Sequence, residues 1–457
     1  MKRPHPSAKN LLPGMGEELI SASDWSRRAA TLVSAVLIGL VAIGFAIAGD
    51  HASSLFERTT HQYPWVYLVS APLVFVAIAA ATNRFAPDAR GSGIPQVIAA
   101  SRMPGNAAIA GLVAIRTALF KAVLTVAALL GGASVGREGP TVQLGAAIMV
   151  QVHRLFRVPI SAGVYIAGGA AGVAAAFNTP LAGIAFAIEE LAVAYEQRVA
   201  VLVMGAVMIS GLTAQGISGD YVYFGQITGS LPIVTVLIAA PIAGLVGGAL
   251  GGLFSRMMLA LRGPGGRFTA RLKARPLTTA LVCGLIVGVL GFVTAGATSG
   301  TGYESTRGLL SGGAAEYWFG PAKFVATLAT SASGIPGGIF APSLAVGAGF
   351  GELLTPLFPP EQAGLIVLIG MGGYFTGVVR APLTAVIILS EATSSSHAIL
   401  PLFATALIGD WAGSMVCKER LYHALAGDFA PGGKPDRSED GDESEGDSPK
   451  GSSTSGA

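Results

Sequence analysis

The chain has 457 residues, of which 52% are hydrophobic and only 12% are charged, and its mean hydropathy is +0.62. Soluble globular proteins carry about 25% charged residues, so the composition excludes an ordinary soluble domain and predicts a membrane protein. The net charge of +3 gives no indication of a nucleic-acid partner. The two cysteines and six dispersed histidines show no disulfide or metal-ligand spacing, and we expect no metal centre.

Apolar stretches without Asp, Glu, Lys or Arg recur along the chain. About 20 helical residues cross a hydrocarbon core of ~30 Å, and several stretches are long enough for one crossing. They cover residues 29–49, 199–219, 221–255, 276–303, 324–351, 362–379 and 392–409. We interpret the first as a retained membrane helix rather than a cleaved signal. Residues 221–255 are long enough to enter the membrane and return. The predicted fold class is an all-α polytopic membrane protein.

The charged segments predict the topology. Residues 1–28 hold five bases and three acids, and residues 262–275 hold five bases and no acid. Both segments are expected on the cytoplasmic side. Residues 427–457 carry seven acids between Asp436 and Asp447, which predicts a disordered acidic tail that solubilises the terminus. The transmembrane domain is then residues 29–426, and both termini are expected in the cytoplasm.

A weak internal repeat relates two parts of the chain at one constant shift of 202 residues. "GREGPTVQLGA" (136–146) falls on "GIFAPSLAVGA" (338–348), and "NTPLAGIAFAIE" (178–189) falls on "RAPLTAVIILSE" (380–391). Lys121 falls on Lys323 without any gap. Two homologous halves, about 29–219 and 231–426, favour a transporter with its site near the midplane between them over a duplicated scaffold with another function.

Three segments share a Gly-rich turn, a proline and then an apolar helix: "GSGIPQV" (91–97), "GREGPTV" (136–142) and "GGIFAPSL" (337–344). Pro is tolerated in the first helical turn, and Gly lets the preceding backbone approach a ligand. Each segment therefore presents a helix N-terminus with free N–H groups, which binds anions. The predicted selectivity-filter residues are Gly91, Ser92, Gly93, Ile94, Pro95, Gly136, Arg137, Glu138, Gly139, Pro140, Gly338, Ile339, Phe340, Ala341 and Pro342.

Glu138 lies in the middle of the second motif, and a carboxylate within a membrane indicates function. Ionised, it would occupy the place of the anion; protonated, it would swing away, so its charge links anion occupancy to protons. The alternative is an ion pair with Arg137. Adjacent residues on a helix do not face each other, so we expect Arg137 to pair elsewhere or to cap carbonyl groups.

A second acidic pair, Glu189 and Glu190, follows an apolar stretch, and the two side chains point about 100° apart if helical. One could be a buried proton relay while the other faces water or pairs with a base. Glu189 has a repeat counterpart in Glu391, which suggests a structural role common to both halves. Glu190 aligns with Ala392 and is the better relay candidate. Because Lys323 repeats Lys121, we favour structural support for Lys121 over a base in an anion pathway.

The motifs "GSGIPQ", "GREGP", "GGIFAPSL" and "RLYHAL" around Tyr422 resemble the signature segments of the CLC chloride channels and proton/chloride antiporters, over about residues 29–426. The resemblance implies a fold of two inverted-topology repeats with broken, re-entrant helices, and homodimers with one pore in each subunit. It implies that Ser92 and Tyr422 supply hydroxyls to a central chloride, while Ile339 and Phe340 supply backbone N–H groups. Glu138 would be the external gating glutamate and Glu190 the internal proton glutamate.

The implied function is secondary active exchange of chloride for protons, with no cofactor. The alternative is a passive voltage- or pH-gated chloride channel of the same fold; passive members typically replace the internal glutamate with an apolar residue. An enzyme is disfavoured, because no nucleophile–base set or metal spacing accompanies the glutamates. Gln96 departs from the Glu that many members carry there. Without the nucleotide-binding modules of many eukaryotic relatives, the chain resembles a prokaryotic member of the bacterial inner membrane, in contact with lipid.

Overall fold

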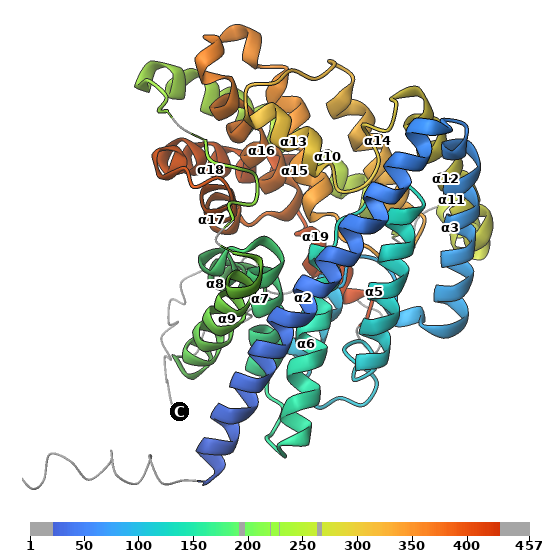
Figure 1. Cartoon of the computed structure of the whole chain (residues 1–457), viewed down its shortest axis with the longest axis vertical. Helices are drawn as coiled ribbons and strands as arrows, with labels where there is room; N and C mark the ends of the chain where they lie inside the picture. The colour runs from blue at the N-terminus through green and yellow to red at the C-terminus, as the bar shows by residue number, and fades with distance from the viewer. Residues whose placement is uncertain (1–21, 192–196, 220, 228, 263–266, 430–457) are drawn as a thin grey trace, which may run out of the picture.

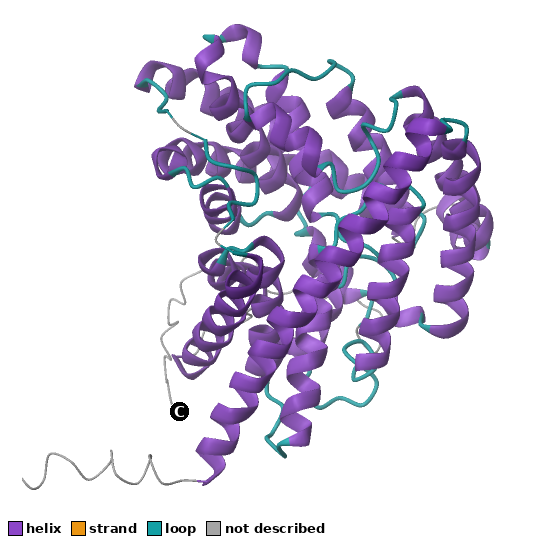
Figure 2. Cartoon of the chain, viewed as in Figure 1, coloured by secondary structure: helices purple, strands orange, loops and turns teal. Residues whose placement is uncertain are grey.

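The computed structural model describes residues 22–191, 197–219, 221–227, 229–262 and 267–429. These residues form helices joined by loops and turns (Figure 2), with no strand among them. The predicted tail and most of the predicted N-terminal segment lie outside the described residues.

The first part of the chain, up to residue 218, forms helices that occupy the blue and green region of Figure 1. They are α2 (Ala22–Gln62), α3 (Val66–Phe85), α4 (Ile94–Arg102), α5 (Ile115–Leu130), α6 (Glu138–Leu155), α7 (Ala162–Phe177), α8 (Pro180–Phe186) and α9 (Gln197–Ser218). A wider helical turn, Ala187–Leu191, continues α8 and carries Glu189 and Glu190.

The second part of the chain, from residue 233, occupies the yellow to red region of Figure 1. Its helices are α10 (Ile233–Arg262), α11 (Arg267–Ala274), α12 (Pro276–Val293), α13 (Tyr303–Leu310), α14 (Phe319–Ala332), α15 (Phe340–Glu352), α16 (Ala363–Val379), α17 (Pro382–Ala392), α18 (Ile399–Val416) and α19 (Leu421–Gly427).

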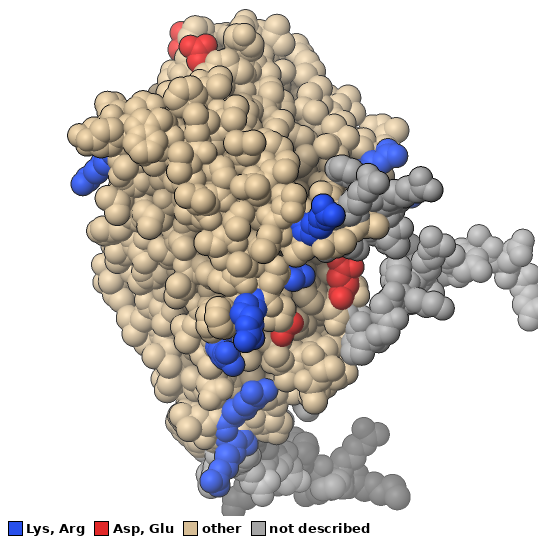
Figure 3. Space-filling model, turned by 90° about the vertical axis from the view of Figure 1, so that its right-hand side faces the viewer, with Lys and Arg blue, Asp and Glu red and all other residues tan. Residues whose placement is uncertain are grey.

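Seven helices of the described part are long and apolar enough to cross a membrane: α2, α3, α9, α10, α12, α16 with the turn before it, and α18 with the turn before it. Figure 3 shows a broad surface without charged side chains. Large apolar side chains are exposed on α3 and α12, which is the pattern of a surface that faces lipid. The chain is an integral membrane protein, as the composition predicted.

Residues 221–255 do not enter the membrane and return, contrary to that expectation. Residues 233–262 form one continuous helix, α10, which Pro241 does not break. The preceding residues form a loop that is held against the end of α17. The backbone N–H groups of Phe224 and Ile227 donate to the carbonyls of Ala392 and Thr393 at 2.8 and 3.1 Å. These hydrogen bonds satisfy a non-helical backbone that the apolar composition alone does not reveal.

The internal repeat is visible in the order and start of the helices. Adding 202 to the first residues of α6, α8 and α9 (138, 180 and 197) gives 340, 382 and 399, the first residues of α15, α17 and α18. The helices before α8 and α17 both end at a non-glycine residue in the left-handed region, Asn178 and Arg380 (φ 56° and 64°), and 178 + 202 = 380. The duplication therefore reaches backbone conformation as well as sequence.

Glu189 and Glu391 hold the two halves together reciprocally. The Glu189 carboxylate accepts hydrogen bonds from the backbone N–H groups of Leu383 and Thr384, at 3.1 and 2.7 Å, at the start of α17. The Glu391 carboxylate accepts from those of Leu181 and Ala182, at 3.2 and 3.0 Å, at the start of α8. Each glutamate thus caps the N-terminus of a helix in the other half. The expected structural role common to both halves is confirmed.

Glycine explains how the long helices approach closely. A Cβ atom on Gly248 of α10 would lie 2.4 Å from the carbonyl oxygen of Gly409 in α18, and one on Gly377 of α16 would lie 2.4 Å from the carbonyl oxygen of Gly248. Real Cβ contacts are never so short, so α10, α16 and α18 pack backbone against backbone. Small residues at helix crossings are typical of membrane proteins, and here they account for part of the high glycine content.

The capping contacts predict a stability change. Glu391→Ala removes both acceptors from the first turn of α8, and loss of a helix cap costs about 1 kcal/mol. We expect a lower thermal unfolding midpoint for the detergent-solubilised variant than for the parent protein, at the same scan rate. Glu316→Ala, at an exposed glutamate, is the matched control and should leave the midpoint unchanged. Equal midpoints for both variants would contradict the capping role.

Candidate functional site

The three Gly-Pro motifs meet through direct hydrogen bonds between their glycines. The backbone N–H of Gly136 donates to the carbonyl of Gly338 at 2.7 Å, and the N–H of Gly338 donates back to Gly136 at 2.8 Å. The N–H of Gly337 donates to the carbonyl of Gly91 at 3.1 Å. These hydrogen bonds join the motifs that begin near positions 91, 136 and 338. The three motifs therefore lie together in the structure.

Each motif is followed by a helix whose first N–H groups have no partner within the helix. In α4, α6 and α15 the first helical hydrogen bonds are donated by Val97, Thr141 and Ser343, to the carbonyls of Gly93, Arg137 and Ile339. The N–H groups before these positions remain available. Close backbone approach is essential here, because a Cβ atom on Gly139 would lie 2.4 Å from the Ser92 hydroxyl and one on Gly93 2.6 Å from the Gly139 carbonyl.

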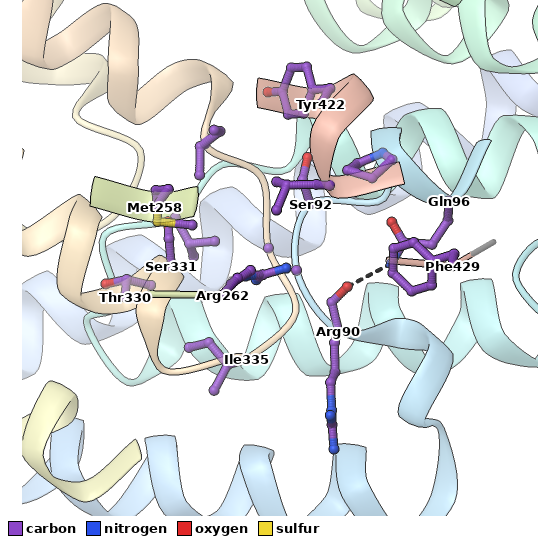
Figure 4. Close-up of a pocket in the computed structure, with 16 residues that line it drawn as sticks. Arg90, Ser92, Gln96, Met258, Arg262, Thr330, Ser331, Ile335, Tyr422 and Phe429 are labelled. Atoms are coloured by element: carbon purple, nitrogen blue, oxygen red, sulfur yellow. Dashed lines mark hydrogen bonds between the residues drawn. The ribbon is translucent and has the colours of Figure 1, made fainter. Parts of the chain in front are cut away.

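Ser92 and Tyr422 line one small cavity of about 20 Å³, together with Ile339 and Gly337. Figure 4 shows their side chains at the same end of this cavity. Both residues are buried, their hydroxyls lie close to each other, and neither has any other hydrogen-bond partner in the described part of the chain. A buried hydroxyl without a partner costs free energy unless something else bonds to it, so the pair marks a place for a ligand that accepts hydrogen bonds.

The side chain of Phe340 is anchored in an aromatic cluster. Its ring packs against those of Phe375, Phe177 and Phe186, with centroids 4.5, 5.8 and 5.9 Å apart. The ring therefore fixes the first residue of α15, and the Phe340 side chain is held in this cluster.

Glu138 is buried beside the start of α15. The Cβ of a side chain added at Gly136 would lie 2.3 Å from Oε2 of Glu138, 3.4 Å from Ala341 Cβ and 3.0 Å from Pro342 Cδ, so the carboxylate shares one small space with both residues. The backbone N–H groups of Ala341 and of Glu138 itself are the donors beside it, and neither is aligned for a hydrogen bond to its oxygens in the described structure. The partial positive charge of the α15 N-terminus faces this carboxylate.

Arg137 turns away from Glu138. Its Nη1 donates to the Ala46 carbonyl at 2.7 Å and to Oδ1 of Asp50 at 2.6 Å, both on α2. Arg137 therefore pairs elsewhere and caps a carbonyl, as predicted. Together with Asp50 and Tyr223 it lines a second cavity of about 500 Å³, which shares no lining residue with the Ser92 and Tyr422 cavity.

Glu190 is fully buried, and neither carboxylate oxygen has a hydrogen-bond partner in the described part of the chain. Glu189, its neighbour, caps α17, so the structure assigns different surroundings to the two acids. Tyr422 lies close enough to both Glu138 and Glu190 to interact electrostatically with each carboxyl group.

Buried bases brace the loops around the site. The ammonium of Lys121 donates to the Gly91 carbonyl at 3.1 Å, and that of Lys323 donates to the carbonyls of Thr298, Ser299 and Gly300 at 2.9, 3.2 and 2.8 Å. The favoured structural role of Lys121 is confirmed. Gln96 also holds the first motif, because its amide donates to the carbonyls of Asp88 and Arg90 at 3.2 and 2.6 Å. An ionised glutamate could not make these bonds.

Two residues near the site were not identified from the sequence. Arg262, the last residue of α10, extends its guanidinium to Gly91, 3.1 Å from where a Cβ there would lie (Figure 4). His423 follows Tyr422 on α19 and contacts Glu190. In the sequence, the place of His423 next to Tyr422 is the feature that could have marked it as a site residue. Its contact with Glu190 joins residues 233 positions apart, and the spacing of the histidines does not reveal it.

Comparison with known proteins agrees with this arrangement. Residues 73–414 match the family described as "Voltage gated chloride channel". The H(+)/Cl(-) exchange transporter ClcA of Vibrio vulnificus (strain YJ016) is 32% identical over 415 residues, which cover 84% of each chain. The protein of the same name from Vibrio cholerae (strain M66-2) is 33% identical over 360 residues, 75% of this chain and 74% of the relative.

Two solved structures share the fold. A slow cyanobacterial Cl-/H+ antiporter aligns with a TM-score of 0.74 at 24% identity, over 87% of this chain and 96% of its own. A CLC-type fluoride/proton antiporter also aligns with a TM-score of 0.74, at 22% identity, over 89% and 99%. The predicted all-helical CLC fold of two inverted repeats with broken helices is confirmed. Because the family match spans most of the chain, and relatives align along most of its length, this protein belongs to the voltage-gated chloride channel, or CLC, family.

Proposed function

We propose that this protein is a secondary active transporter that exchanges chloride for protons. The observation that carries the proposal is the buried, unpaired Glu138 carboxylate beside the N-terminus of α15. That position is one where an anion would bind, so an ionised Glu138 and a chloride compete for the same N–H groups. The relatives named H(+)/Cl(-) exchange transporters support the same activity.

The chloride site consists of the hydroxyls of Ser92 and Tyr422 and the backbone N–H groups of Ile339 and Phe340. These donors carry no full charge, so they hold an anion without trapping it. Ile339 and Ser92 line the same small cavity as Tyr422, and Phe340 begins the helix beside them. Protein donors alone form this site, and no cofactor takes part.

Glu138 is the external gate and Glu190 the internal proton acceptor. A protonated Glu138 is neutral and leaves the helix N-terminus for the larger cavity beside Arg137, which opens the anion path. When it loses its proton, the carboxylate returns and displaces the anion. The proton passes toward Glu190, and this alternation makes chloride and protons move in opposite directions.

We further propose that the protein resides in a bacterial inner membrane with both termini in the cytoplasm, and that it forms a homodimer with one pathway per subunit. Exposed apolar side chains on α9 and α18, such as Leu212, Leu407 and Trp411, offer a surface that a second copy would cover. Sedimentation in detergent should give the mass of two chains, and a monomer would contradict the dimer.

The exchange is tested in liposomes that contain the purified protein and a chloride gradient. We expect chloride flowing down its gradient to drive protons uphill in the opposite direction, seen as a pH change that a protonophore abolishes. Chloride flux without any proton movement would identify a passive channel instead. The same vesicles report selectivity when chloride is replaced by nitrate or fluoride, and chloride should be preferred.

Glu138→Gln should retain chloride flux but abolish proton coupling and the pH dependence of the flux. The neutral amide has the shape of the protonated gate and cannot release a proton. Chloride efflux and proton uptake are measured on the same vesicles. A variant that still pumps protons would exclude Glu138 as the gate.

Glu190→Gln should also retain chloride flux and lose proton transport, because the internal proton acceptor is removed while the anion site is intact. Glu189→Gln is the matched control, since Glu189 caps α17 and should leave coupling unchanged. If Glu189→Gln abolishes proton transport and Glu190→Gln does not, the assignment within the pair is wrong.

A further inference from the structure

Glu190 is fully buried, so a proton needs a carrier between it and water. Arg420, Glu189 and Arg102 are the charged groups that interact with it electrostatically. Glu189 is committed to capping α17, and arginine does not release its proton in proteins. None of these three side chains can pass a proton to Glu190.

His423 is the titratable side chain that contacts both Glu190 and the surface. Its Nε2 lies 3.7 Å from Oε1 of Glu190 and 3.1 Å from the Glu190 carbonyl oxygen. Its side chain is 24% exposed, whereas that of Glu190 is 0% exposed. The imidazole therefore bridges the distance between water and the buried carboxyl, and it does so from α19, the helix that also carries Tyr422.

The tautomer of His423 is set by Arg102. The guanidinium Nη2 of Arg102, an exposed residue at the end of α4, lies 2.7 Å from Nδ1 of His423. Arginine only donates, so Nδ1 accepts and the neutral ring carries its proton on Nε2. That N–H points at Glu190, where it donates to the carbonyl oxygen. The ring is thus oriented with its proton toward the acceptor.

We propose that His423 is the proton relay between the cytoplasmic solution and Glu190; this inference rests on the exchange proposed above. When the exposed Arg102 side chain moves away, a proton from water adds to Nδ1. The Glu190 side chain, whose Oε1 lies 3.7 Å from Nε2, then turns to within hydrogen-bond distance of the Nε2–H group. The Nε2–H bond breaks, and its proton forms an O–H bond on Oε1 of Glu190. The ring is left neutral with its proton on Nδ1. Proton exchange with water through the imidazolium returns it to the Nε2–H form that Arg102 selects.

The neighbouring charges keep the carrier state short-lived. Burial disfavours a positive imidazolium at His423, and so do Arg102 and Arg420, while the hydrogen bond to the Glu190 carbonyl favours it. A positive ring therefore gains by passing its proton to Glu190, which neutralises both groups. The transfer from the His423 imidazolium to the Glu190 carboxylate therefore involves only these two side chains.

The relay is tested with two variants of one size, His423→Gln and His423→Glu. Both keep a side chain that can accept from Arg102, but only the glutamate variant can bind and release a proton. In the liposome assay we expect His423→Gln to lower proton transport about a hundredfold, the lower end for loss of a general acid–base group, with chloride flux retained. His423→Glu should restore proton transport, with an optimum at lower pH. His397→Asn, at an exposed histidine, is the control and should match the parent.

Three results would overturn the relay. One is unchanged proton transport in His423→Gln. Another is equally low proton transport in His423→Glu and His423→Gln while chloride flux persists. The third is loss of chloride flux and proton transport together in both variants, which would show that the histidine is only structural. If the parent protein itself moves no protons against the chloride gradient, the exchange is refuted rather than the relay.

Discussion

The hydrogen-bonded pair of Gly136 and Gly338 is the contact on which the rest of the site depends. It joins the second motif to the third, and the bond from Gly337 to Gly91 adds the first. Three helix N-termini then meet, and each brings backbone N–H groups with partial positive charge. Because no side chain fits between these glycines, the site is built from backbone, and an anion bound there is held by dipoles and hydroxyls.

The two halves of the repeat share one structural frame, and they differ at the acids that we propose exchange protons. Glu189 and Glu391 cap each other's halves, and Lys121 and Lys323 both brace loops through carbonyl groups. At positions 138 and 190 one half has an acid where the other has Phe340 and Ala392. Phe340 is locked in an aromatic cluster, whereas Glu138 is unpaired. Both halves thus share the scaffold, and only one of them carries the two acids that we propose exchange protons.

The fold and the motifs could be predicted because their signals are local. An apolar stretch, a matching pair of repeat segments or a Gly-Pro turn is found in the same short segments that form the corresponding helix or turn. Contacts between distant segments were not predictable: Arg137 with Asp50 spans 87 residues, and His423 with Glu190 spans 233. The path of residues 221–232 was also missed, because hydrogen bonds to the end of α17, rather than composition, hold that loop.

We propose that an anion binds where the three motifs meet and that the Glu138 carboxylate competes with it for the same N–H groups. Crystals grown with bromide in place of chloride, measured at the bromine absorption edge, locate the anion directly. We expect an anomalous peak within hydrogen-bond reach of the Ser92 and Tyr422 hydroxyls and the N–H groups of Ile339 and Phe340. In Glu138→Gln we expect a second peak beside Ala341. Bromide bound elsewhere, with no peak among these donors, would show that the anion does not bind where the motifs meet.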